Sequence, residues 1–220
     1  KPFICCEYTH AMGNSIGGMH KYTDLTDEEP LYQGGFIWDF VDQAIWHKDR
    51  YGKDALAYGG DFGDRPNDGN FSGDGILFAD RKLTTKMQEV KFNYQNFDLD
   101  VTAEKITIHN KSLFTDVAAY ELHLELMLDG KVIWESSSDA PHILPGETGT
   151  VALENLPLTN AGEETVTASL RLKEDTLWAK KGFEIAFGQG TWQVDEVEVP
   201  EPKEAVAATD FAKAERHFHY

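Results

Sequence analysis

Positive charge is scarce in this sequence, which has 20 lysines and arginines against 38 aspartates and glutamates and a formal net charge of −18. Binding of DNA or RNA relies on basic side chains that neutralise phosphates, so this balance argues against a nucleic-acid partner. An anionic membrane surface is disfavoured for the same electrostatic reason. We therefore expect neither a nucleic-acid partner nor a membrane partner.

Cysteine and long apolar runs are scarce as well. The two cysteines, Cys5 and Cys6, are adjacent, and neighbouring residues of a strand point to opposite faces, so no disulfide framework is expected. No stretch approaches the ~18 apolar residues of a membrane span, and the sequence that starts at Lys1 shows no signal-peptide pattern. These absences favour a cytoplasmic protein.

The length limits the possible folds. A chain of 220 residues suits one or two domains, whereas a complete (β/α)₈ barrel needs about 250 residues. Composition changes along the chain, because residues 1–94 hold 12 of the 19 glycines and a net charge of −5, while residues 95–220 carry −13. We predict a domain over 1–94, a second domain over 95–195, and a third segment over 196–220.

The first part is predicted to form a strand, a helix and a second strand. The apolar run Phe3–Tyr8 is typical of a strand that is buried on both faces. A helix is predicted over 13–29, and the run 34–40 after a glycine pair predicts the next strand. This βαβ order implies parallel strands covered by a helix.

The second part has the alternation of an antiparallel sheet. Over 120–128 alternate residues are apolar, and Asp129-Gly130 then predicts a tight hairpin turn. About seven short strands between Phe97 and Val194 indicate an immunoglobulin-like β-sandwich. The expected core residues include Ile106, Ile108, Val151, Leu153, Val166, Ala168, Leu170, Leu172 and the large side chains of Trp134, Trp178 and Trp192.

The last segment, 196–220, is predicted to be an acidic linker or the start of a further domain, with a docking strand as an alternative. His217 and His219 near the end could bind a metal ion. Two histidines in an exposed tail are more often inert, so we expect no metal site there.

A carboxylate lies at the end of the first predicted strand, and an aromatic residue lies at the end of the second. Glu7 lies where barrel enzymes place catalytic groups, although it could instead cap the next helix or pair with Lys21. Trp38-Asp39 places an indole beside a carboxylate, a combination that suits a sugar, since one face of a pyranose packs on a ring while its hydroxyls need acceptors. Together they make a glycosidase as plausible as a purely structural role.

The segment 58–80 is rich in glycine, aspartate and asparagine and is predicted to be an ordered loop. Its oxygen atoms could hold a hard cation, or its side chains could simply stabilise turns. An EF-hand is excluded because Pro66 would occupy a ligand position, and Phe62 breaks the glycine-rich calcium repeat. Zinc-type spacings and phosphate-binding glycine loops are absent from the sequence.

Three segments together resemble a known family. Residues 6–15 (CEYTHAMGNS), 33–43 (QGGFIWDFVDQ) and 58–64 (YGGDFGD) resemble, in this order and spacing, the glycoside hydrolase family 2 β-galactosidases of the bacterial lac type. The resemblance covers residues 1–94, and the predicted sandwich matches the family in type and position.

The resemblance assigns roles to individual residues. It implies that Glu7 is the nucleophile of a retaining hydrolysis through a covalent galactosyl-enzyme, that His10 contacts galactose hydroxyls, and that galactose packs on Trp38. It also implies a sodium ion held by the Phe71 carbonyl and the Asp74 side chain. Asp74 departs from the asparagine usual in the best-known members and adds a charge there.

The same resemblance implies parts that this sequence does not contain. The acid/base of the family is a glutamate that follows asparagine on an earlier barrel strand, and no Asn-Glu pair occurs here. The magnesium ligands of the family also lie upstream. We therefore expect the last βα units of a TIM barrel followed by the sandwich, a chain inactive by itself, and an oligomer or a large- and small-subunit assembly acting on lactose-type β-galactosides. The alternative is a non-catalytic carbohydrate-binding or subunit-docking sandwich module.

Overall fold

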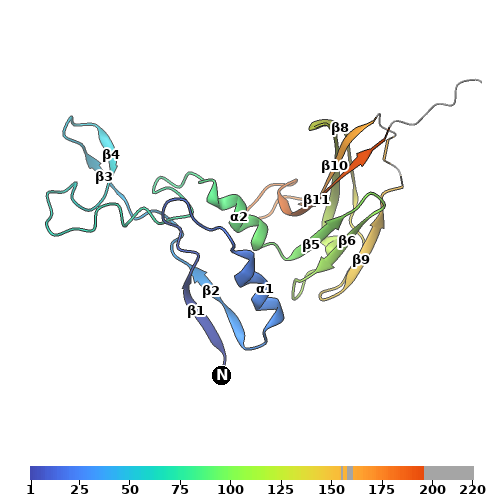
Figure 1. Ribbon diagram of the computed structural model, residues 1–220, viewed down its shortest axis with the longest axis horizontal. Coiled ribbons are helices and arrows are strands. Elements are labelled where there is room, and N and C mark those ends of the chain that lie inside the picture. Colours follow the sequence, from blue (N-terminus) through green and yellow to red (C-terminus); the bar gives the residue numbers. More distant parts are fainter. Residues whose placement is uncertain (155, 158–160, 196–220) are drawn as a thin grey trace, which may run out of the picture.

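The computed structural model describes residues 1–154, 156–157 and 161–195. The predicted linker over 196–220, with His217 and His219, lies outside the described residues. A parallel strand pair with a covering helix, a projecting hairpin and a strand-rich unit follow one another along the chain (Figure 1). The described helices are too short and too polar to span a membrane.

The predicted strand, helix and strand are all present near the N-terminus. Strand β1 (Phe3–Tyr8) pairs in parallel with β2 (Tyr32–Ile37), and helix α1 (His20–Glu28) connects them. Tyr8 lies opposite Ile37, so both strands end at the same level. The crossover helix lies beside the strand pair (Figure 1).

Helix α1 is shorter than predicted. It starts at His20 rather than near Gly13 because the preceding segment is not helical. Ile16 has φ 73°, and Gly13 and Gly18 have φ 64° and 73°, all in the left-handed region. A right-handed helix cannot pass through such positions, so the glycines end the loop rather than begin the helix.

The prediction that the first strand is buried on both faces is wrong for the described residues. Phe3 and Ile4 are 59% and 55% exposed, whereas Tyr8 is buried. In the described part of the chain β1 pairs only with β2, so most of its surface has nothing to pack against. The apolar pattern therefore shows which side chains of the strand are suited to burial. Whether they are buried depends on the strands and helices that pack against them.

A hairpin that the sequence did not predict precedes the loop over 58–80. Strand β3 (Ile45–Lys48) pairs with β4 (Asp54–Ala57), and the hairpin projects away from the rest of the molecule (Figure 1). The loop itself contains side-chain turns: Asp61 accepts from Tyr58 N–H and Asp64 accepts from Gly60 N–H, both at 3.0 Å. Turn stabilisation, one of the two alternatives predicted for this loop, is thus seen at these aspartates, and cation binding stays a prediction.

The C-terminal part consists of two antiparallel sheets that share one core. The described residues from Phe97 onward form seven strands, which matches the number predicted. The three-stranded sheet has the order β5 (Phe97–Val101), β6 (Lys105–Asn110), β9 (Thr148–Ala152). The four-stranded sheet has the order β11 (Glu184–Val194), β10 (Gly162–Leu172), β7 (Tyr120–Leu128), β8 (Lys131–Asp139), and a 3₁₀ turn, η1 (Val117–Ala119), precedes β7.

Most of the predicted core is confirmed. The inward residues Ile106, Ile108, Val166, Ala168 and Leu170 are fully buried between the sheets, as period-two alternation predicts. Trp134 and Trp192 pack on this core.

Trp178 is the exception, because it is 66% exposed. It lies between β10 and β11, where it packs edge-on against Phe183 at 5.5 Å between ring centroids. The prediction that it is core is wrong, since it belongs to a connection rather than to a strand.

Helix α2 (Lys86–Asn93) and the residues just after it join the two parts through specific contacts to β11. The Gln95 side chain accepts a hydrogen bond from Phe187 N–H at 3.1 Å and donates one to Phe187 O at 3.2 Å. Both the backbone donor and the backbone acceptor of Phe187 are thus hydrogen-bonded. Lys91 forms an ion pair with Glu184 at 2.6 Å. These contacts fix the N-terminal part on the sandwich.

Asp116 stabilises the entry to β7 and gives a testable pH dependence. Its Oδ1 accepts from Ala118 N–H at 2.9 Å and Ile143 N–H at 3.0 Å, and its Oδ2 lies 3.0 Å from His142 Nδ1. The Ala118 N–H, then His142 and the Ile143 N–H, hold the pKa of the carboxyl below its usual value. Because the folded-state pKa is the lower one, this stabilisation is present above the unfolded pKa and is lost as the pH falls through the folded pKa.

We expect Asp116→Ala to lower Tm by about 2–5 °C at pH 7, which is the scale of losing a capping residue in a chain of this size. The difference should shrink below about pH 4, where the carboxyl of the unfolded chain becomes protonated. Asp100→Ala, at an exposed position on β5, is the control. Thermal melts from pH 7 to pH 3 check this, and a constant difference over that range would refute the charge-based account.

Candidate active site

Strands β1 and β2 end at the same edge of the parallel pair. The predicted site residues lie at this edge, in or just after the last residues of the two strands. His10 comes two residues after β1 ends, and Trp38 directly follows β2. Ala11 N–H donates to the Trp38 carbonyl at 2.6 Å, which holds the two loops together. Residues far apart in sequence thus meet at the carboxyl ends of the strands, where barrel enzymes hold their catalytic groups.

Glu7 is the penultimate residue of β1 and is exposed. Its carboxylate makes no hydrogen bond or ion pair with another described residue. The alternative roles are not seen, because the N-cap of α1 is Met19 with no side-chain cap and the ion pairs within the described residues do not join Glu7 to Lys21. Glu7 is therefore available to a ligand at the end of the strand.

Tyr8 anchors the strand on the opposite side from Glu7. Its hydroxyl hydrogen-bonds that of Tyr94, and the ring packs edge-on against Tyr22. Burial is the main cause, and the hydrogen bond to Tyr94 the second, that raises the pKa of Tyr8 well above its usual value. The phenol therefore stays neutral, and the strand end that carries Glu7 is fixed by a neutral, buried neighbour.

Trp38 and Asp74, which are 36 residues apart, form a direct hydrogen bond. The indole Nε1–H donates to Asp74 Oδ2 at 3.0 Å. Asp74 is 2% exposed, whereas Trp38 is 45% exposed. The buried carboxylate thus fixes the orientation of an indole whose ring still offers surface to a ligand.

The second carboxylate oxygen of Asp74 is buried and, among the described residues, has no hydrogen-bond partner. A buried anionic oxygen without a donor is costly, so a cation or a ligand donor would stabilise it. The Phe71 carbonyl, three residues earlier, accepts no hydrogen bond within the described part of the chain. This donor set of hard oxygens fits a monovalent or other hard cation.

His10 and Phe71 also come together. Their rings lie 5.8 Å apart between centroids and are tilted by 34°. Thr9 has φ 45°, a left-handed conformation that is unfavourable for a β-branched residue, and it turns the chain between β1 and His10. The strained residue thus sets the direction in which His10 leaves the strand.

Asp39, singled out with Trp38 from sequence, has a local role. Its Oδ1 accepts from Phe40 N–H and its Oδ2 accepts from the Gln43 side chain at 2.9 Å. The carboxylate therefore stabilises its own loop. Asp74, rather than Asp39, is the acid that contacts the indole.

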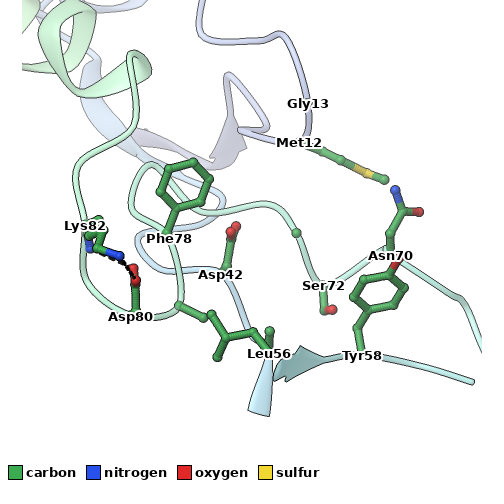
Figure 2. A pocket seen from close by; sticks show the side chains of 13 residues that line it. Met12, Gly13, Asp42, Leu56, Tyr58, Asn70, Ser72, Phe78, Asp80 and Lys82 are labelled. Carbon is green, nitrogen blue, oxygen red and sulfur yellow. Dashed lines mark hydrogen bonds and ion pairs between the residues drawn. The ribbon is translucent and has the colours of Figure 1, made fainter. Parts of the chain in front are cut away.

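A cavity of about 550 Å³ is lined in part by Asn70, Ser72 and Gly73, the sequence neighbours of Phe71 and Asp74 (Figure 2). Asp42 extends into it, and an Asp80–Lys82 ion pair of 2.8 Å lies to one side (Figure 2). The predicted site residues are not part of its lining, which consists of Met12, Gly13, Asp42, Ala44, Leu56, Tyr58, Asn70, Ser72, Gly73, Phe78, Ala79, Asp80 and Lys82.

Asp42 is a residue that sequence reasoning missed. Its Oδ1 accepts from Gly75 N–H at 2.8 Å, directly beside Asp74. The available signal was a second aspartate three residues after Asp39, but nothing in the sequence told which loop it would contact.

The described residues contain no group of three or more His, Cys, Asp or Glu side chains arranged to hold a metal ion. A cation at Asp74 would therefore depend on backbone carbonyls and a single carboxylate. That arrangement suits a weakly bound ion better than a zinc or calcium centre.

Comparison with known proteins finds a family match in each of the two parts of the chain. Residues 1–99 match the family described as "Glycosyl hydrolases family 2, TIM barrel domain", and residues 106–193 match "Beta-galactosidase, domain 4". The β-galactosidase of Halalkalibacterium halodurans is 49% identical over 200 residues, which are 90% of this chain and 20% of that protein.

Two further relatives are also named β-galactosidases. The β-galactosidase of Clostridium acetobutylicum is 50% identical over 86% of this chain and 21% of its own length. That of Streptococcus thermophilus is 44% identical over 91% of this chain and 19% of its own length. The chain thus spans about a fifth of the length of these relatives, which are named β-galactosidases, and it belongs to glycoside hydrolase family 2.

Proposed function

We propose that this chain is part of a retaining β-galactosidase that hydrolyses terminal β-D-galactose residues, as in lactose-type substrates. The observation that carries the proposal is that Glu7 and Trp38 lie at the ends of two paired parallel strands, with the Trp38 indole hydrogen-bonded to Asp74, in a chain 49% identical over 200 residues to a β-galactosidase. An exposed carboxylate beside an oriented indole provides a nucleophile and a platform for a pyranose.

The chemistry assigns a distinct role to each residue. The Glu7 carboxylate attacks the anomeric carbon as the bond to the leaving-group oxygen breaks, and a covalent galactosyl-enzyme forms. Water then attacks the same carbon, which restores the carboxylate and retains the configuration. Trp38 supports the apolar face of the sugar, and His10, turned toward Phe71, hydrogen-bonds its hydroxyls.

Retention needs a second carboxyl group ~5–5.5 Å from the first, to protonate the leaving group and later deprotonate water. We propose that this acid/base, like the magnesium ligands, lies elsewhere in the complete polypeptide. Residues 1–94 would then be the last βα units of the catalytic barrel, 95–195 an immunoglobulin-like sandwich, and 196–220 a linker or the start of the next domain.

We also assign a sodium ion to the Phe71 carbonyl and the Asp74 carboxylate. The support is the buried Asp74 Oδ1 that lacks a partner among the described residues. A bound cation would neutralise this charge and supply an electrostatic contact to a sugar hydroxyl. We further propose a cytoplasmic enzyme that assembles as an oligomer or as large and small subunits.

The test compares the complete polypeptide that carries these residues with the 220-residue chain, using an aryl β-galactoside. The complete polypeptide should release the phenol, and NMR should show β-galactose as the first sugar product. The chain alone should show no turnover, because losing one of two catalytic carboxyl groups costs roughly 10²–10⁴-fold and the opposite site wall is lost too. Initial α-galactose, or equal rates for both proteins, would contradict the proposal.

A further inference from the structure

Consecutive peptide groups connect the loops of the site by hydrogen bonds. The Trp38–Asp39 peptide accepts a hydrogen bond from Ala11 N–H at its carbonyl. The N–H of the same peptide donates to the Asp74 carbonyl at 2.7 Å. One rigid, planar group therefore links the loop after β1 to the segment that carries Asp74.

The next peptide group continues this series and ends on a charge. The carbonyl of the Asp74–Gly75 peptide is the acceptor just described, and its N–H donates to Asp42 Oδ1 at 2.8 Å. Hydrogen bonds in such a chain polarise one another, and a carboxylate is the strongest acceptor that can end it. Holding both ends of a planar peptide restrains ψ of Asp74, and so the position of the Cα from which its side chain extends.

The close fit at Gly75 shows that this geometry is tightly determined. A Cβ at position 75 would lie 2.1 Å from Asp42 N and 2.5 Å from Leu77 O. These are backbone atoms that cannot rotate away. Gly75 is thus held directly over the backbone of the residue whose side chain accepts its N–H.

We propose that Asp42 is a positioning residue for the sugar site: by holding the Asp74–Gly75 peptide, it aims Asp74 at the Trp38 indole. This inference rests on the proposed function for its catalytic consequence, but not for its structural one. Asp42 does not itself meet the sugar. It acts through Asp74, whose Oδ2 accepts from Trp38 Nε1–H at 3.0 Å.

The surroundings of Asp42 make the inference testable without unfolding the protein. Asp42 faces the cavity of about 550 Å³, where water can enter and solvate a freed Gly75 N–H (Figure 2). Asp42→Ala should therefore fold. Asp42→Asn keeps an oxygen acceptor and serves as the conservative rescue.

Asp80→Ala is the matched control. It removes an aspartate from the same cavity, where Asp80 pairs with Lys82 and takes no part in the peptide series. Circular dichroism on all variants would check that the sheets remain intact.

The first readout is structural and uses the 220-residue chain with ¹⁵N-labelled tryptophan. Trp38→Phe identifies the Trp38 signal among those of the five tryptophans. In Asp42→Ala this indole N–H signal should move upfield and exchange with solvent about tenfold faster, because its acceptor is no longer held in place. It should stay unchanged in Asp42→Asn and Asp80→Ala.

The second readout is kinetic and uses the complete polypeptide with an aryl β-galactoside. Asp42→Ala should lower kcat/KM by about 10- to 100-fold, the cost of a misplaced site group. The loss should lie mainly in KM, because the indole contacts the sugar in the ground state and the transition state alike. Asp42→Asn should stay within about threefold of the unmodified enzyme, and Asp80→Ala should match it.

The outcomes separate this inference from the proposed function. An unchanged Trp38 signal in Asp42→Ala, or an equal change in Asp80→Ala, overturns the positioning role whatever the activity. If the unmodified complete polypeptide hydrolyses no galactoside, the proposed function fails, and the Trp38 signal alone still decides the role of Asp42.

Discussion

Glu7→Gln in the complete polypeptide should lower kcat toward aryl β-galactosides by at least about a thousandfold, because an amide cannot form the glycosyl ester. The replacement has nearly the same shape and removes only the charge. Glu7 is exposed and lacks hydrogen bonds to other described residues, so Tm should stay within about 1 °C of the unmodified protein. A large loss of activity without a loss of stability separates a nucleophile from a structural residue.

Two measurements complete this test. A 2-fluoro galactosyl inactivator should leave its label on the peptide that contains Glu7, and mass spectrometry locates it. Glu28→Gln, at an exposed position on α1, is the matched control and should retain full activity. A label on a different peptide, or a Glu7→Gln enzyme with more than about a tenth of normal kcat, would exclude the nucleophile role.

The sandwich could be predicted well because its signal is local. Along β5 and β6 buried residues alternate with more exposed ones, so a period of two in the sequence directly gives the face that the structure buries. The hairpin at Asp129-Gly130 is equally local, with both residues at positive φ. Trp178 shows the limit, because hydrophobicity alone does not distinguish a core residue from one in a connection.

The N-terminal part was harder to predict because its structure depends on distant contacts. The order of β1, α1 and β2 was predictable from apolar runs, but the start of α1 depends on the left-handed φ of Ile16, which hydrophobic spacing does not reveal. The hairpin β3–β4 was missed because each strand has only four residues. So short a stretch carries too little periodicity to detect.

The candidate site likewise contains residues that the sequence predicts and contacts that only the fold reveals. Glu7 and Trp38 could be proposed because each lies at the end of an apolar run. The bond from Trp38 to Asp74 spans 36 residues, and the Asp42–Gly75 bond spans 33, so both depend on how two loops pack. Sequence identifies residue types suited to sugar chemistry, whereas the partners that orient them come from the fold.

Gly188→Ala should destabilise the sandwich by about 3 kcal/mol or more, the upper range for overpacking a close contact. The two sheets approach each other closely where β11 meets β5. A Cβ at Gly188 would lie 1.9 Å from Leu99 O, and one at Gly190 would lie 2.1 Å from Val101 O. These are backbone oxygens, so the clash can be relieved only by moving a strand, which would open the core over Leu99 and Val101.

Thermal and urea unfolding of the 220-residue chain would measure this effect, with an expected fall in Tm of about 10 °C for Gly188→Ala. Gly17→Ala is the matched control, since no atom lies within 4 Å of its added Cβ and its φ is outside the left-handed region. That variant should shift Tm by no more than about 2 °C, and in the favourable direction if the unfolded chain loses entropy. Equal effects at the two glycines would mean that backbone entropy, rather than the contact with Leu99, sets the requirement for glycine. A stable Gly188→Ala would mean that the sheets can separate at this point without cost.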